Sequence, residues 1–153
     1  MDVTIEISKD QVWERVFDRV ARTADGLGRR IDLGVMGLVL ALNASGVRTT
    51  ASCEGHMDHG HPFPWVWVPS ADSGLLDARL EAFYTRGGVP DRMLTSCYLL
   101  EDTYILQPRG AALQERRTHD ERAAALLGYQ QEARRFAEWL RDRFFEEEAC
   151  YAA

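Results

Sequence analysis

The segment from Leu33 to Leu42 constrains the fold of this chain more than any other, because it is apolar on nearly every side. Gly34 and Gly37 interrupt it, and it falls short of the roughly 18 apolar residues that a membrane-spanning helix needs. A helix without a polar face is stable only where other elements cover it. We therefore expect a helix that is capped by Asp32, stopped near Gly46 and buried inside a globular protein.

Two amphipathic helices flank this segment in the sequence, and each begins at a capping motif. Ser8 and Gln11 form a capping box, and apolar residues at helical spacing continue the first helix to about Ala24. Thr118 and Glu121 form a second capping box before a long C-terminal helix. The inner face of this last helix is expected to carry Leu126, Gln130, Ala133, Phe136 or Ala137, Leu140 and Phe144.

The remaining segments indicate strands around one more helix. β-Branched and alternating patterns predict strands over residues 2–7, 47–52, 65–68, 93–100 and 103–107. A helix opens at Asp72 or Ser73 and ends at the glycine pair 87–88. This order predicts a single α+β domain over residues 1–153, in which helices cover one mostly antiparallel sheet of about four or five strands.

Composition narrows the classes of protein to which the chain can belong. Apolar residues make up 46% and charged residues 27%, which is typical of a soluble globular protein with no membrane span. The net charge of −6 disfavours nucleic acid as a partner, because phosphates are repelled. We expect a cytoplasmic location, since there is no signal-peptide pattern and three scattered cysteines do not suggest a disulfide framework.

Residues 53–61 contain an unusual density of reactive side chains. Three of the four histidines and one of the three cysteines fall within these nine positions, together with Glu54 and Asp58. Folding alone does not require so many nucleophiles, bases and metal-ligand types in one loop. The segment is therefore the candidate functional site.

One interpretation of this loop is a metal site. The candidate ligands for zinc or another transition metal are Cys53, His56, His59 and His61, with Glu54 as the general base for a bound water. Four ligands from so short a loop would crowd one another. We therefore expect two or three of them to bind, with the remainder from elsewhere, and His119 is the only other histidine.

A second interpretation needs no metal. Cys53 would be a nucleophile, and His56 or Glu54 its general base. In either case Trp65 and Trp67 share one face of a strand and could form the wall of a site for a small-molecule ligand, although packing inside the protein explains them equally well. We expect Cys97, by contrast, to be a small core residue.

The function that these residues favour is a metal-binding or small-ligand-binding enzyme. The alternative is a non-catalytic binding or interaction module whose Cys-His loop has a structural role only. A homodimer is a further possibility, because aromatic residues that prove to be exposed could form its interface.

The segment Ser52-Cys53-Glu54-Gly55-His56 resembles a signature of uncharacterised bacterial proteins, S-C-E-G-H. An apolar helix before it and the run 65–68 after it extend the likeness, which implies a shared site. The chain is more distantly similar to the wybutosine-synthesis tRNA methyltransferase family, in which the corresponding string is S-S-C-S-G-R. Glu54 and His56 stand where that family has Ser and Arg, and the loss of this Arg removes a phosphate contact.

Overall fold

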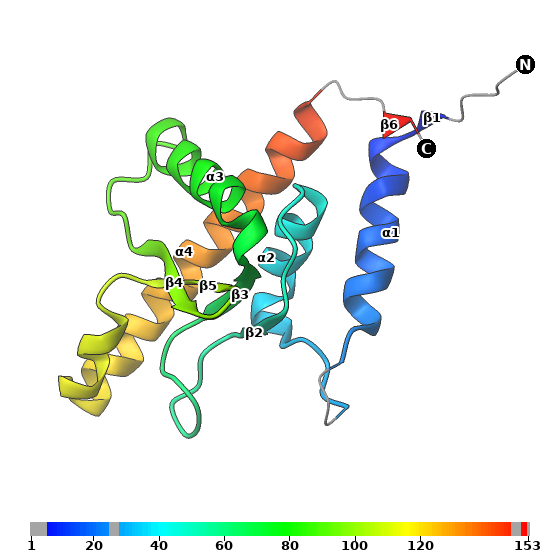
Figure 1. Ribbon diagram of the computed structural model, residues 1–153. Coiled ribbons are helices and arrows are strands. Elements are labelled where there is room, and N and C mark those ends of the chain that lie inside the picture. The colour runs from blue at the N-terminus through cyan, green and yellow to red at the C-terminus, as the bar shows by residue number, and fades with distance from the viewer. Residues whose placement is uncertain (1–5, 25–27, 148–150, 153) are drawn as a thin grey trace, which may run out of the picture.

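The computed structural model describes residues 6–24, 28–147 and 151–152. Its helices are α1 (Lys9–Arg22), α2 (Leu33–Ala44), α3 (Ser73–Arg86) and α4 (His119–Glu146), with short 3-10 helices η1 (Ser70–Asp72) and η2 (Ala111–Arg116). Its strands are β1 (Glu6–Ile7), β2 (Ala51–Cys53), β3 (Trp65–Pro69), β4 (Leu94–Leu100), β5 (Thr103–Pro108) and β6 (Tyr151–Ala152). The order of helices and longer strands agrees with the prediction from the sequence (Figure 1). Val3 and Ile5 of the expected first strand lie outside the described residues.

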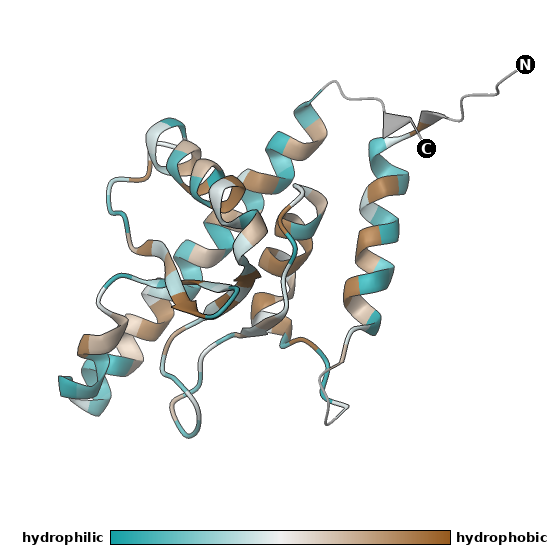
Figure 2. Cartoon of the chain, viewed as in Figure 1, coloured by the Kyte–Doolittle hydropathy of each residue, from teal (hydrophilic) through white to brown (hydrophobic). Residues whose placement is uncertain are grey.

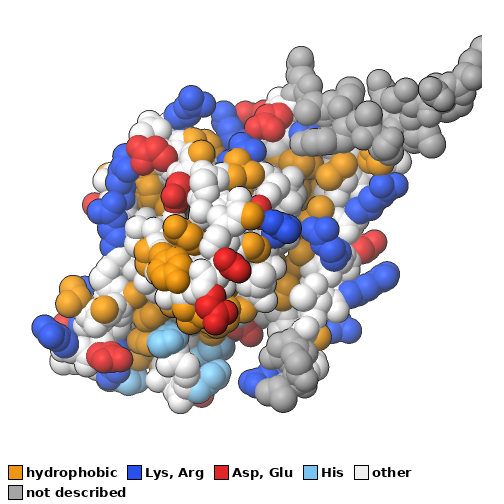
Figure 3. Space-filling model, in the orientation of Figure 1, with side chains coloured by type: hydrophobic (Ala, Val, Ile, Leu, Met, Phe, Trp, Pro, Cys, Tyr) orange, Lys and Arg blue, Asp and Glu red, His pale blue; other side chains and the backbone are white. Residues whose placement is uncertain are grey.

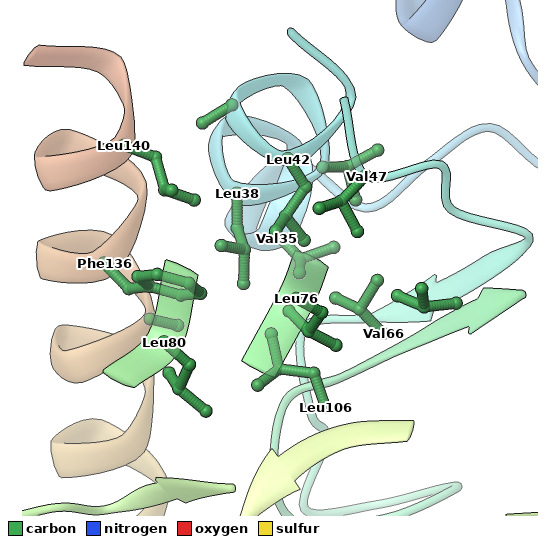
Figure 4. Close-up of a cluster of buried hydrophobic side chains, with 14 of the residues drawn as sticks. Val35, Leu38, Leu42, Val47, Val66, Leu76, Leu80, Leu106, Phe136 and Leu140 are labelled. Carbon is green, nitrogen blue, oxygen red and sulfur yellow. The ribbon is translucent and has the colours of Figure 1, made fainter. Parts of the chain in front are cut away.

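Most of helix α2 is buried as its composition predicts, while Leu33 at its start is 85% exposed. The helix lies between α1 and α4 (Figure 1), and hydrophobic residues cover its length in Figure 2. Figure 4 shows its side chains meeting those of α3, α4 and the sheet in one core. The residues labelled there that form this core are Val35, Leu38, Leu42, Val47, Val66, Leu76, Leu80, Leu106, Phe136 and Leu140.

The main sheet has four antiparallel strands in the order β2-β3-β5-β4, and β1 pairs with β6 separately. Along β3 the side chains alternate, so that Val66 and Val68 are buried in the core while Trp65 and Trp67 point to the opposite face. Cys53 is paired with Trp65 across the strands and therefore shares this second face. The main core thus lies on one face, and the other carries the thiol and both indoles, where Trp65 packs against Phe63, Ala111 and Tyr129.

The caps differ in part from those expected. Ser8 and Gln11 form the predicted capping box, but α1 ends at Arg22, two residues early. Thr118 accepts a hydrogen bond from the Glu121 N–H as predicted, and its hydroxyl donates to the Glu121 carboxylate. Asp32 is the N-cap residue of α2, but the prediction that its side chain caps this helix is wrong, because it makes no such hydrogen bond.

Two predictions about strands also need correction. The strand expected over residues 47–52 is only the three residues of β2, because the chain before it is occupied by contacts with the end of α2, such as the Val47 N–H bonding to the Leu42 carbonyl. Cys97 is exposed, so it is not a core residue. It belongs to the edge strand β4, on the same sheet face as Trp67 and opposite the main core.

Within the described part of the chain, no helix combines the length and the apolar character that crossing a membrane requires. Tyr98 and Leu100 on β4 are exposed hydrophobic residues at a sheet edge. The homodimer stays a prediction.

A buried carboxylate joins α4 to α3 and β4. Glu132 is 1% exposed, and its Oε2 accepts hydrogen bonds from the Tyr84 hydroxyl at 3.2 Å and from the Met93 N–H at 3.3 Å. The same hydroxyl oxygen accepts from the Leu94 N–H at 2.8 Å. Burial raises the pKa of Tyr84 far above its ordinary value, so the hydroxyl keeps its proton and remains a donor.

We predict that Glu132→Leu lowers the free energy of unfolding by about 2–6 kcal/mol, because it leaves two donors without an acceptor at about 1–3 kcal/mol each. Glu132→Gln keeps an acceptor oxygen and should cost less. Urea unfolding measures both, with Glu138→Leu at an exposed position of the same helix as the control, expected to change stability by about 0.5 kcal/mol or less. Equal effects of the leucine substitutions at positions 132 and 138 would contradict the assigned role.

Candidate functional site

The loop that joins β2 to β3 forms a tight hairpin-like turn at one end of the sheet. Within this loop the His56 N–H donates to the His61 carbonyl at 3.0 Å, which joins its two sides. Figure 3 shows histidine side chains gathered at the lower edge of the molecule, where Figure 1 places this loop. The histidines of the predicted site therefore lie at the surface of the molecule, next to the sheet face opposite the main core.

Gly55 permits the sharp turn between the thiol and the first imidazole. Its φ is 89°, a left-handed conformation that strongly favours glycine. A Cβ at this position would lie 2.7 Å from Leu126 Cδ1 and 2.7 Å from the carbonyl carbon of Phe63. The loop thus packs closely against α4. Gln130 of that helix donates from Nε2 to the Glu54 carbonyl at 3.0 Å. This bond gives the one polar residue expected on the inner face of α4 a partner.

Cys53 and His56 converge with a third residue, Asp32, from the start of α2. The candidate ligand atoms of these three side chains all lie within 4.8 Å of one another. Asp32 Oδ2 lies 3.4 Å from His56 Nε2, and all three residues are half-buried. A thiol, an imidazole and a carboxylate in one cluster are the ligand types that zinc takes in proteins.

The carboxylates of Asp32 and Glu54 make other hydrogen bonds than those that the sequence suggests. Glu54 Oε2 accepts a hydrogen bond of 2.7 Å from the Gly34 N–H in the first turn of α2. It therefore satisfies an N–H that has no partner within the helix, as an N-cap side chain usually does. Asp32 Oδ2 instead accepts from the Glu54 N–H at 3.1 Å. Glu54, expected as a general base, has its carboxylate at a helix end, and the structure does not test the catalytic role.

The surroundings of Cys53 favour the neutral thiol. Burial raises its pKa, and the nearby carboxylates of Asp32 and Glu54 raise it further, against the opposing effect of a hydrogen bond from the Gly55 N–H. That N–H lies 3.4 Å from Sγ. A reactive cysteine needs the opposite, a cationic neighbour that stabilises the thiolate. These surroundings therefore disfavour the thiolate that a nucleophile needs, and the catalytic role expected for Cys53 stays a prediction.

The other predicted ligands are placed differently. His59 stacks on His56 with ring centroids 4.1 Å apart, and its Nδ1 lies 2.8 Å from Asp58 Oδ1. His56, Asp58 and His59 form a second, more exposed cluster of possible ligands. His61 stacks on Phe63 and belongs to neither cluster among the described residues. His119 is exposed beside Asp120 and also lies outside both.

Trp65 lines two cavities. The first cavity has a volume of about 370 Å³ and is lined by the three clustered residues, His59, Trp65 and the hydroxyl-bearing residues Thr49, Thr50 and Ser52. The second cavity has a volume of about 450 Å³ and is lined by both indoles. The rings of Trp65 and Trp67 are 5.3 Å apart, and both are half-buried. The indoles thus line cavities, and one of these cavities also contains the Cys-His cluster.

Sequence reasoning missed Asp32 as a member of the site. Asp32 and Glu54 are 22 positions apart, and nothing in the local pattern connects them. The only signal was the position of Asp32 before an apolar helix, which indicated a cap. The side chain became available to the loop because Glu54 took over that capping role.

Comparison with protein-family models, with curated proteins and with solved structures found no match for this chain. The two resemblances noted from the S-C-E-G-H segment therefore stay predictions.

We predict that Glu54→Ala lowers the free energy of unfolding by about 0.5–2 kcal/mol, the usual cost of losing an N-terminal cap. Glu54→Gln should cost less, because its amide oxygen can still accept from the Gly34 N–H. Thermal or urea unfolding measures the difference, and Asp58→Ala, an exposed carboxylate of the same loop, is the matched control. A loss no larger than that of the control would show that Glu54 is not the cap.

We also predict that iodoacetamide alkylates Cys53 more slowly than free cysteine at neutral pH in chelator-treated protein. A raised pKa leaves less thiolate at any given pH, so the rate should continue to rise above the pH at which a free thiol levels off. Peptide mass spectrometry follows each cysteine separately, and exposed Cys97 is the internal reference. Faster alkylation of Cys53 than of Cys97 at neutral pH would contradict the prediction and revive the nucleophile interpretation.

Proposed function

We propose that this protein binds a divalent transition metal, zinc by preference, through Asp32, Cys53 and His56, and uses it on a small molecule in the first cavity. The observation that supports this most strongly is the convergence of three different ligand types from α2, β2 and the following loop to within 4.8 Å. Three protein ligands with one remaining position are the usual arrangement of catalytic zinc, whereas structural zinc sites take four.

The surroundings of the cluster support the same conclusion. Metal ligands in proteins are usually oriented by hydrogen bonds from the next layer of residues. Here the Glu54 N–H holds Asp32 at 3.1 Å, and the Gly55 N–H reaches Cys53 Sγ at 3.4 Å. A cation at this point would also offset the negative charge that makes the thiolate unfavourable. The adjoining cavity, at about 370 Å³, is large enough for a small ligand.

The chemistry that such a metal supplies is the activation of a bound water or the polarisation of a substrate oxygen. Activating a bound water requires that one of its protons be removed. The pair His59–Asp58 lies next to the cluster and can accept that proton. Asp58 holds His59 Nδ1 at 2.8 Å, which leaves Nε2 of the same ring to accept or give a proton. We therefore infer a metal-dependent hydrolytic or related water-using reaction, with His59 as general base in place of Glu54.

Metal binding tests this proposal directly. Chelator-treated protein is titrated with zinc by calorimetry and with cobalt by absorption spectroscopy, and elemental analysis gives the stoichiometry. We expect one metal per chain and a thiolate-to-cobalt charge-transfer band. Cys53→Ser, His56→Ala and Asp32→Asn should each weaken binding by more than the roughly 10–100-fold that follows loss of an outer-layer partner.

His61→Ala and Cys97→Ser are the matched controls, since neither residue belongs to a cluster of possible ligands in the described chain. Both should retain wild-type affinity. Thermal unfolding without metal checks that the variants fold. Absence of stoichiometric metal, or wild-type affinity in Cys53→Ser and His56→Ala, would overturn the proposal and leave the loop with a structural role.

A further inference from the structure

Two adjacent arginines, Arg29 and Arg30, line the first cavity together with the metal cluster. Both are exposed residues of the segment that joins α1 to α2. Arg30 pairs with Ala24 in an isolated antiparallel bridge, which holds its backbone beside the end of α1. Within the described part of the chain the Arg30 side chain makes no ion pair. Its guanidinium can therefore bind an anion that enters the cavity.

Hydroxyl groups on the β2 side of the cavity add further hydrogen-bond donors. Thr49, Thr50 and Ser52 line the cavity from β2 and from the two residues before it. Thr49 Oγ1 accepts a hydrogen bond from Asn43 Nδ2 at 3.0 Å, so the proton of this hydroxyl is left to donate to a ligand. Hydroxyl and guanidinium donors are groups that fix polar and charged parts of a ligand in its pocket.

The charged side chains that line the first cavity sum to a positive charge, although the chain as a whole carries −6. Asp32 is the one acidic residue among the described lining residues, against two arginines. If a divalent cation binds, its charge is matched by the Asp32 carboxylate and a Cys53 thiolate. The arginine charges then remain in the lining, so the cavity favours an anion, and more strongly with the metal than without it.

We propose that the substrate of the first cavity carries an anionic group, a phosphate or a carboxylate, that Arg30 binds together with Arg29 and the Thr49 hydroxyl. A guanidinium can donate two parallel N–H bonds to either group. The inference names the substrate class of the proposed metal site and rests on that site for the reaction. The arginines do not depend on the metal, so the anion should bind to chelator-treated protein as well.

Three phenyl compounds of similar size test this inference. Phenylphosphonate and benzoate are anions, benzamide is the neutral counterpart of benzoate, and Trp65 offers all three the same aromatic wall. Each is titrated by calorimetry into chelator-treated protein in a phosphate-free buffer. We expect saturable binding of an anion that is about tenfold or more tighter than that of benzamide and that weakens at high ionic strength.

The preferred anion identifies the group on the substrate. Tighter binding of phenylphosphonate indicates a phosphate, and tighter binding of benzoate indicates a carboxylate. Binding of neither anion, or equal affinity for benzoate, phenylphosphonate and benzamide, would overturn the inference.

The same titrations with zinc separate this inference from the proposed function. Zinc should tighten anion binding by about tenfold or more, and the anion should tighten zinc binding by the same factor, because coupling between two sites is reciprocal. Anion binding to a protein that takes up no zinc would overturn the metal proposal alone. Zinc binding that leaves anion affinity unchanged would overturn the placement of the anion beside the metal.

Substitutions then locate the bound anion. Arg30→Gln should weaken anion binding by about tenfold or more and leave benzamide unchanged. Arg15→Gln removes the same charge from an exposed position of α1 outside the cavity and is the matched control. Thermal unfolding checks that each variant folds, and Thr49→Val tests the other wall if Arg30→Gln does not. Wild-type anion affinity in the cavity variant, or an equal loss in Arg15→Gln, would contradict the assignment.

Discussion

Helix α2 has no polar face, so it is stable only where other elements cover it. The rest of the molecule is arranged to provide that cover. Helices α1 and α4 lie on either side of it, while α3 and the sheet complete the core. Because the main core forms on one face of the sheet, the opposite face carries Cys53, Trp65 and Trp67, with Ala111 and Tyr129 packed against Trp65. Burial of one apolar helix thus determines which face of the sheet can carry the candidate site.

Much of this fold could be predicted from the sequence because its signals are local. A capping box begins α1, Thr118 caps α4 through the predicted half of its box, and apolar spacing along the helices identifies the sides that face the core. The hairpin of β4 and β5 follows from two strand-like runs around Glu101-Asp102. The exceptions are positions where long-range contacts decide. Cys97 has a strand pattern suited to either face, and only the pairing of the strands around the core shows that its side chain is exposed on the face opposite that core.

The candidate site was predictable in its location but not in its membership. A concentration of cysteine and histidine in nine positions identifies the loop, and the spacing of Cys53 and His56 correctly suggests that they meet. The partner of this pair is Asp32 rather than another residue of the loop, because Asp32 and Glu54 each satisfy a backbone N–H that belongs to the other's segment. No periodicity in a single sequence reports such an exchange across 22 positions.

That exchange makes the first turn of α2 and the loop after β2 a single cooperative unit. If the loop opens, Gly34 loses the acceptor of its N–H, and if the helix end frays, Asp32 leaves the cluster and Glu54 loses its backbone partner. Amide hydrogen exchange at these two segments would then proceed at one common rate. A cation or substrate that holds the loop closed would slow exchange in the helix as well. Binding at a surface site would therefore protect a helix that belongs to the core.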